Sequence, residues 1–149
     1  MRFQRILAAH GPGAILMVRL LVGGVFLLEG MKKFIFVEQW GAGRFARIGI
    51  PAPGIMGPFV GVVEIVCGFL ILIGLLTRVA SIPLLVNIGV AIATTKIPIL
   101  SRSGFWPMEA EARTDYSMLM GLLFLLLAGA GSWSVDKRLA PKTQGPNAP

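Results

Sequence analysis

One carboxylate lies inside a long apolar stretch of this chain. Glu64 belongs to a hydrophobic run from Val60 to Thr95, which little interrupts apart from the turn at Leu76-Thr-Arg78. An ionisable side chain in a membrane span costs about 2.5–3.5 kcal/mol on insertion scales, so it usually faces the bundle interior or a partner. Glu64 is therefore a candidate proton acceptor or hydrogen-bonding partner for a ligand head group. A protonated or paired glutamate that joins helices is the alternative, and the sequence leaves both open.

The surrounding run predicts a helical hairpin in a membrane. It contains two apolar segments of membrane length, and the turn between them is too short for anything but an antiparallel arrangement. Apolar residues make up 55% of the 149 residues and charged residues only 14%, whereas a soluble chain has about 25% charged residues. Composition therefore predicts a polytopic membrane protein with one domain.

The apolar segments define four predicted spans, at about residues 13–31, 58–76, 78–95 and 115–133. Residues 1–12 are a flank, 13–136 the membrane domain, 34–50 an interfacial segment anchored by Trp40, 96–113 a polar connector and 137–149 a disordered tail. Asp115 is expected to cap the fourth span. The predicted fold is an all-α integral membrane four-helix bundle with short interfacial segments in its loops. Four spans put both termini on one side, which we expect to be cytoplasmic.

Counting depth along alternating spans gathers polar residues at one end of the bundle. At about 1.5 Å per residue, Glu64 lies roughly 9 Å from the nearer end of its span, on the side where the first span ends and the fourth begins. The predicted ligand or proton site at that end consists of Glu64, Lys96, Tyr116, Glu29, Lys32 and Asp115. Within it, Glu29 and Lys32 are one helical turn apart, and Glu29 with Lys32 or Lys33 fits an interfacial ion pair better than a catalytic pair.

Three other polar residues are assigned structural roles, namely Arg19, Asn87 and Arg78. The depth count puts Arg19 toward the opposite end, roughly 12 Å from Glu64 along the bilayer normal, so we expect no direct ion pair between them. Arg19 is interpreted as a packing or anchoring residue whose side chain extends toward the boundary. Asn87, counted nearer the middle, is expected to supply an interhelical hydrogen bond.

The sequence argues against several kinds of site. The net charge is +7, but the basic residues are scattered at the ends of apolar segments, so no nucleic-acid partner is expected. Cys67 is the only cysteine, which excludes an intrachain disulfide, a redox cysteine pair and a cysteine metal cluster, and no metal site is expected. The chain contains no phosphate-binding loop, zinc pattern or hydrolase elbow.

The order and spacing of five short segments resemble the DoxX family of small membrane proteins. They are Arg19-Leu-Leu-Val-Gly-Gly-Val-Phe-Leu-Leu-Glu-Gly-Met-Lys-Lys-Phe34, Gly49-Ile-Pro51, Val63-Glu-Ile-Val-Cys-Gly68, Gly74-Leu-Leu-Thr-Arg78 and Gly129-Ala-Gly-Ser-Trp-Ser-Val-Asp136. The resemblance implies a four-helix inner-membrane protein related to the DoxD subunit of thiosulfate:quinone oxidoreductase, taken as its large subunit. It carries over only Arg19, Glu64 and Arg78, which match recurrent polar positions of the family.

The resemblance implies a quinone-interacting or redox-homeostasis subunit of a membrane oxidoreductase system, in a bacterial-type inner (plasma) membrane. Quinone is the only cofactor it suggests, and the expected partners are membrane lipids, oxidoreductase subunits and further copies of the chain. Because the chain has no redox cysteine pair, any electron transfer would depend on other subunits or on quinone itself. The alternatives are a non-catalytic scaffold or assembly partner and, third, a small-molecule transporter.

Overall fold

The computed structural model describes residues 13–139, and every regular element within that range is a helix. The long helices are α2 (Ala14–Ile35), α5 (Pro53–Ile73), α6 (Thr77–Ala91) and α8 (Phe105–Ala128). The short elements are α3 (Val37–Trp40), α4 (Ala42–Arg47), the π-helical η1 (Ile92–Lys96), α7 (Ile97–Ser103) and α9 (Val135–Leu139). The all-α prediction is confirmed. The flank 1–12 and residues 140–149 of the tail lie outside the described residues, and residues 137–139 belong to α9.

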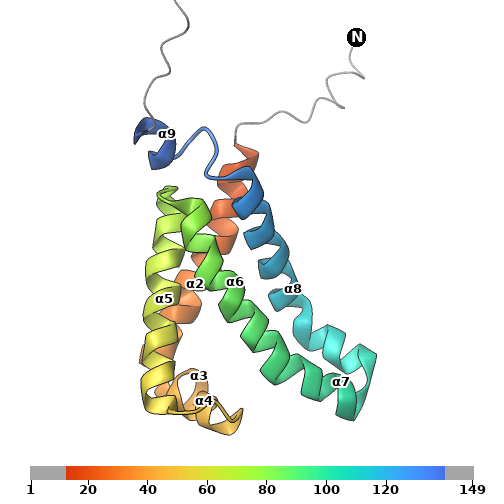
Figure 1. Ribbon diagram of the computed structural model, residues 1–149. Helices are drawn as coiled ribbons and strands as arrows, with labels where there is room; N and C mark the ends of the chain where they lie inside the picture. The colour runs from red at the N-terminus through yellow and green to blue at the C-terminus, as the bar shows by residue number, and fades with distance from the viewer. Residues whose placement is uncertain (1–12, 140–149) are drawn as a thin grey trace, which may run out of the picture.

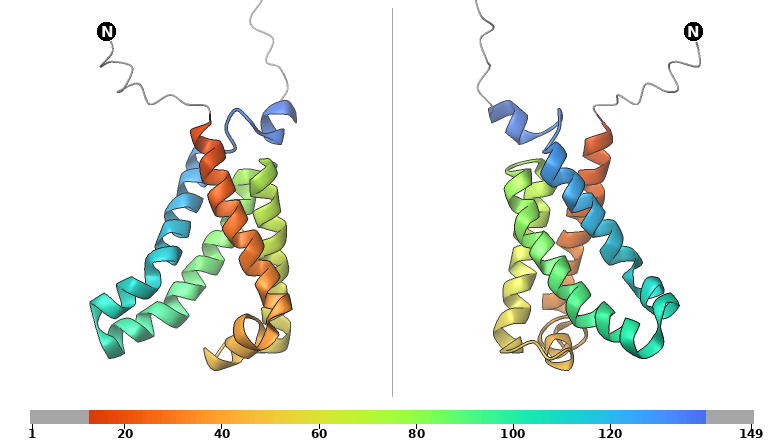
Figure 2. Two further views of the ribbon diagram at one scale, coloured as in Figure 1. Left: turned by 180° about the vertical axis from the view of Figure 1, so that it is seen from behind. Right: turned by 45° about the vertical axis from the view of Figure 1, so that its right-hand side comes forward.

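The long helices form two antiparallel pairs (Figure 1). Helices α2 and α5 make one pair, and α8 packs against the continuous stretch of α6, η1 and α7 in the other. The two pairs meet at the end where α2 begins and α5 turns into α6, and they diverge toward the opposite end, as both views in Figure 2 show. The short helices α3 and α4 occupy the predicted interfacial segment at that diverging end.

Within residues 13–139, three helical stretches are long and apolar enough to cross a membrane, namely α2, α5 and the 27-residue stretch Thr77–Ser103 that contains α6, η1 and α7. Helix α8 has the length but not the composition, because even its last 18 residues, 111–128, include Glu111, Arg113 and Asp115. The protein is therefore membrane-embedded, and the number of four membrane spans stays a prediction.

The second span begins earlier than predicted because proline is tolerated in the first turn of a helix. Pro53 stands in the first turn of α5, where its missing N–H removes no intrahelical hydrogen bond. Pro58, which the sequence analysis placed at the start of the span, lies inside the helix. Glu64 is consequently near the middle of α5 and deeper than the depth count placed it.

The polar connector predicted at 96–113 is helical except at Gly104, whose φ of +86° ends α7. Ahead of it, the π-helical turn η1 directly precedes α7, whose second residue, Pro98, has no N–H to donate to the preceding turn. Met, Glu, Ala and Arg follow Pro107, and these residue types favour helix. The predicted cap is therefore wrong, because α8 begins at Phe105 and Asp115 lies within it.

Helices α2 and α5 approach so closely that glycine is required at their crossing. A Cβ atom on Gly23 would lie 2.8 Å from the carbonyl oxygen of Gly68, and one on Gly30 would lie 2.7 Å from that of Gly61. Both obstacles are backbone atoms, which cannot rotate away as a side chain would. Close approach through small residues is a common way for helices to associate in lipid.

Gly23→Ala is expected to destabilise the protein, whereas Gly24→Ala is not. The first adds a methyl group against the α5 backbone, and such overpacking costs typically about 1–3 kcal/mol. The second adds it where no heavy atom lies within 4 Å, and alanine gains up to about 1 kcal/mol of helix propensity over glycine. Thermal unfolding in one detergent, followed by circular dichroism, compares the two variants. Equal midpoints would contradict the close α2–α5 contact.

Candidate functional site

Glu64 is the central residue of a buried polar cluster that joins three helices. Its side chain extends from α5, and the residue is 4% exposed. Lys33 of α2 donates a hydrogen bond from Nζ to Oε2 of Glu64 at 2.5 Å, and Asn87 of α6 donates from Nδ2 to Oε1 at 2.6 Å. We call Lys33, Glu64 and Asn87 the Glu64 cluster. Its carboxylate has one protein donor on each oxygen.

The local fold explains how these three side chains meet. The tight crossing of α2 and α5 at Gly30 and Gly61 brings the two backbones together just before Lys33. The lysine stem can then reach across to Glu64, one turn beyond Gly61 on α5. The position of Asn87 beside Glu64 is explained by the α5–α6 hairpin, in which α6 runs back alongside α5. In apolar surroundings such charge-assisted hydrogen bonds are stronger than they are in water.

The six residues predicted for a ligand or proton site fall into separate groups. Glu29 and Lys32 form a partly exposed ion pair at 2.5 Å. Lys96 is buried and its Nζ lies 3.1 Å from Asp115 Oδ2 and 3.9 Å from Glu111 Oε2, between η1 and α8.

Tyr116, the remaining predicted site residue, is 63% exposed. Among the described residues, no hydrogen bond or ion pair joins Glu64 to Lys96 or Tyr116, so the direct partners of Glu64 differ from those the depth count suggested.

Two members of the Glu64 cluster were not assigned to it from the sequence. Lys33 was considered only as a partner for Glu29, and its Nζ does approach the backbone oxygen of Glu29 at 3.5 Å. Asn87 was predicted to make an interhelical hydrogen bond, but the residue that accepts it was not identified. The usable signal was an amide in the adjacent arm of the hairpin, because Glu64 and Asn87 lie at nearly equal distances along the chain from the turn between α5 and α6.

Arg19 is 1% exposed, and its side chain extends, as predicted, toward the end of the bundle where α2 begins, where it is buried among the other elements. From α2 its guanidinium donates four hydrogen bonds to backbone oxygens, two at the end of α5 and two in the loop after α8. The acceptors are Ile71 at 2.8 Å, Leu72 at 2.6 Å, Trp133 at 2.6 Å and Ala130 at 3.2 Å. The final carbonyls of a helix lack intrahelical donors, and a cation there also complements the helix dipole. Within residues 13–139, Arg19 makes no ion pair or hydrogen bond to Glu64.

Further capping bonds fasten the same end of the bundle. Asp136 accepts hydrogen bonds from the backbone N–H groups of Leu76 at 2.8 Å and Thr77 at 3.3 Å, at the start of α6. Arg78 donates from Nη2 to the backbone oxygen of Leu127 at 3.0 Å, near the end of α8. The α5–α6 turn and the loop after α8 therefore satisfy each other's exposed backbone groups.

No metal site emerges from the part of the chain that the structure describes. No three histidine, cysteine, aspartate or glutamate side chains are grouped there to hold an ion, and Cys67 is a buried free thiol. The chemistry available in the Glu64 cluster is thus hydrogen bonding and proton transfer by a carboxylate, an ammonium group and an amide.

Comparison with known proteins gives two family matches that overlap along the chain. The model described as DoxX matches residues 14–97, and the model described as TQO small subunit DoxD matches residues 57–148. The second description corrects the expectation of a large subunit.

Three relatives align with most of the chain. An uncharacterized membrane protein of Mycobacterium tuberculosis is 53% identical over 146 residues, covering 94% of this chain and 90% of the relative. A protein of Bacillus subtilis named putative oxidoreductase CatD is 28% identical, covering 81% of this chain and 83% of its own. An uncharacterized protein of Haemophilus influenzae is 27% identical, covering 91% and 98%. No solved structure matches the chain.

Proposed function

The chain belongs to the DoxX family of membrane proteins, and on that premise we propose that it is a quinone-interacting subunit of a membrane oxidoreductase system. Two names support the link to oxidoreductases, the TQO subunit of the second family match and the putative oxidoreductase of Bacillus subtilis. The observation that carries the proposal is the Glu64 cluster, an acid, a base and an amide held within apolar helices.

The cluster contains the groups that a quinone head group needs. A quinone carbonyl oxygen accepts hydrogen bonds, and Lys33 and Asn87 are donors. Reduction to the quinol adds two electrons and two protons. In this proposal the electrons come from a partner oxidoreductase subunit and both protons come from water. Glu64 takes up the protons one at a time and passes them to the quinone oxygens, since a carboxylate can alternately hold and release one.

The arrangement of the helices gives a lipid-soluble ligand a direction of approach. Helices α5 and α6 are joined by the Glu64–Asn87 hydrogen bond, and from there they diverge toward the end that carries α3 and α7 (Figure 2). In the proposal, the head group reaches the cluster from the membrane and takes over a donor that now serves Glu64.

The proposal is tested by titrating the purified protein in detergent with decylubiquinone. Binding is measured as quenching of the fluorescence of its three tryptophans. We expect saturable binding that Glu64→Gln and Asn87→Leu each weaken by about tenfold, as loss of a charge-assisted hydrogen bond would. Glu29→Gln is the matched control, because Glu29 pairs with Lys32 outside the cluster and its variant should bind within about twofold of the original chain. Absence of saturation, or equal loss in Glu29→Gln, would refute the quinone site.

A non-catalytic scaffold is the second candidate, and one observation favours it. Both oxygens of Glu64 already have protein donors, so the cluster is satisfied without a ligand and can act purely as a joint between helices. A scaffold predicts that Glu64→Gln changes the unfolding temperature and the retention of a co-purifying partner, with no saturable quinone binding in either form.

We further propose that α8 is a fourth crossing and that the protein lies in a bacterial plasma membrane with both ends cytoplasmic. Charges in the first half of α8 have partners, Asp115 with Lys96 and Glu109 with Arg113 at 3.6 Å, which lowers the cost of placing them near lipid. The start of α2 and helix α9 lie at the same end of the molecule, as an even number of crossings requires (Figure 1).

A further inference from the structure

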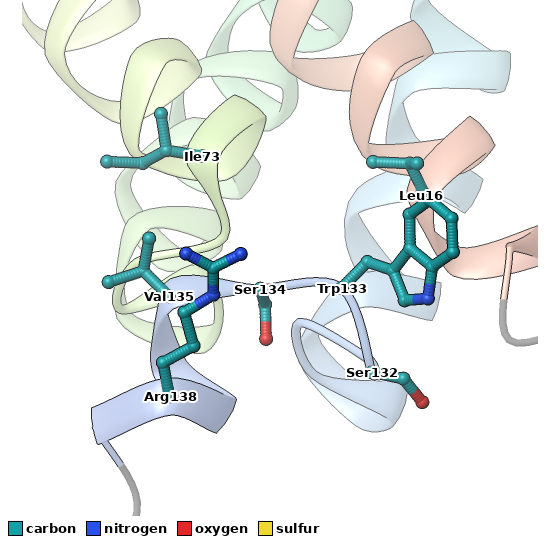
Figure 3. A pocket seen from close by; sticks show the side chains of 7 residues that line it. All are labelled: Leu16, Ile73, Ser132, Trp133, Ser134, Val135 and Arg138. Carbon is teal, nitrogen blue, oxygen red and sulfur yellow. The ribbon is translucent and has the colours of Figure 1, made fainter.

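We propose that a cavity beside α9 binds the phosphate head group of an anionic phospholipid. The cavity holds about 470 Å³ and opens at the end of the bundle where the two helix pairs meet. It is lined by Leu16, Ile73, Ser132, Trp133, Ser134, Val135 and Arg138. In Figure 3 the apolar side chains of Ile73 and Leu16 lie in the upper part of the view, and we call them the apolar side of the cavity. Arg138 and Ser132 lie in the lower part, and we call them its polar side.

The polar side of this cavity has an available cation. Within residues 13–139 the Arg138 guanidinium makes no hydrogen bond or ion pair, and the neighbouring carboxylate of Asp136 is occupied in capping α6. An arginine fork matches two oxygens of a phosphate, and this bidentate geometry is among the stronger charge-assisted interactions. The hydroxyl of Ser132 is a second lining donor without a partner among these residues.

The apolar side decides between a lipid and a soluble anion. Leu16 and Ile73 belong to the ends of two helices that can cross a membrane, so the wall they form continues into the hydrocarbon region. Trp133 is 68% exposed, and tryptophan is typical of the level where lipid head groups lie. A phospholipid would place its phosphate at Arg138 and the start of its acyl chains along Leu16 and Ile73. A free phosphate would use only the polar side.

Native mass spectrometry of the full chain in mild detergent tests the site. Phosphatidylglycerol and phosphatidylcholine with the same acyl chains are titrated separately, and the probe for a soluble anion is inorganic phosphate. We expect tighter binding of phosphatidylglycerol, weakened by about tenfold in Arg138→Gln, as loss of one charge-assisted pair predicts. Lys137→Gln is the matched control, since it removes the same charge from the adjacent residue, which does not line the cavity, and it should change binding by less than about twofold.

Three outcomes would overturn the proposal. Equal losses in Arg138→Gln and Lys137→Gln would mean that general surface charge attracts the lipid. Equal affinity for the two lipids would mean that the net charge of the head group is not recognised, because both carry a phosphodiester and only phosphatidylcholine balances it with a trimethylammonium group. Displacement of the lipid by inorganic phosphate at similar concentration would assign the cavity to a soluble anion. Arg138 is exposed on the last helix, so its variant should fold, and an unchanged unfolding midpoint is the check.

Discussion

Replacing Arg19 by methionine should be one of the two most destabilising single changes to a polar side chain. The variant keeps a flexible apolar stem but removes four hydrogen bonds, and the carbonyls of Leu72, Ala130 and Trp133 lose the donor that Arg19 supplies. The Ile71 carbonyl keeps the backbone N–H of Gly74 at 3.1 Å. Leaving buried groups unpaired costs about 1–3 kcal/mol each, so we expect a loss of at least about 3 kcal/mol. Denaturation in detergent, followed by circular dichroism, measures it.

Two companion variants give that measurement its controls. Arg19→Lys keeps the charge but has a single nitrogen, which cannot reach acceptors on both α5 and the loop after α8, so it should recover only part of the stability. Arg113→Met removes an exposed arginine whose partner is one turn away on the same helix, and should cost less than about 0.5 kcal/mol. If Arg19→Met and Arg113→Met had equal free energies of unfolding, the capping bonds of Arg19 would not hold the helix ends together.

Lys33→Met should be nearly as damaging, because it leaves the Glu64 carboxylate buried without its cation. Removing one partner of a buried ion pair costs about 3–5 kcal/mol, whereas removing both charges is often close to neutral. The double variant Lys33→Met/Glu64→Gln should therefore recover most of the loss, and glutamine still offers an oxygen to Asn87. A double-mutant cycle on unfolding free energies measures the coupling. Additive losses would contradict a buried ion pair between these residues.

The sequence was sufficient for the membrane class, the DoxX assignment and the position of the hairpin, because these depend on apolar length and on the order of short segments. It misjudged depth where helix ends were uncertain. Pro58 was taken as the start of a span, but Pro53 occupies the first turn, so Glu64 is at mid-helix. Glu64 meets Asn87 because the two residues lie nearly equally far along the chain from the α5–α6 turn. Likewise α8 extends back to Phe105 through good helix formers that had been assigned to a connector by their polarity.

Contacts between distant parts of the chain could not be derived by counting along spans. Arg19 bonds to Ala130 and Trp133, more than a hundred residues away, and Asp136 caps the start of α6. Depth restricts which residues share a level, but the rotation of each helix decides which of them face one another. Lys33 rather than Lys96 therefore reached Glu64, because the glycine crossing of α2 and α5 turns that face of α2 inward.

Photoaffinity labelling tests the central claim, a quinone head group at the Glu64 cluster, most directly. A quinone with an azide on its ring would be irradiated with the purified protein, and the modified peptide identified by mass spectrometry. The account predicts attachment within residues 30–35 of α2, 60–68 of α5 or 83–91 of α6, suppressed by excess decylubiquinone and by Glu64→Gln. Attachment confined to the exposed Trp106 or Trp133, or unaffected by the competitor, would contradict it.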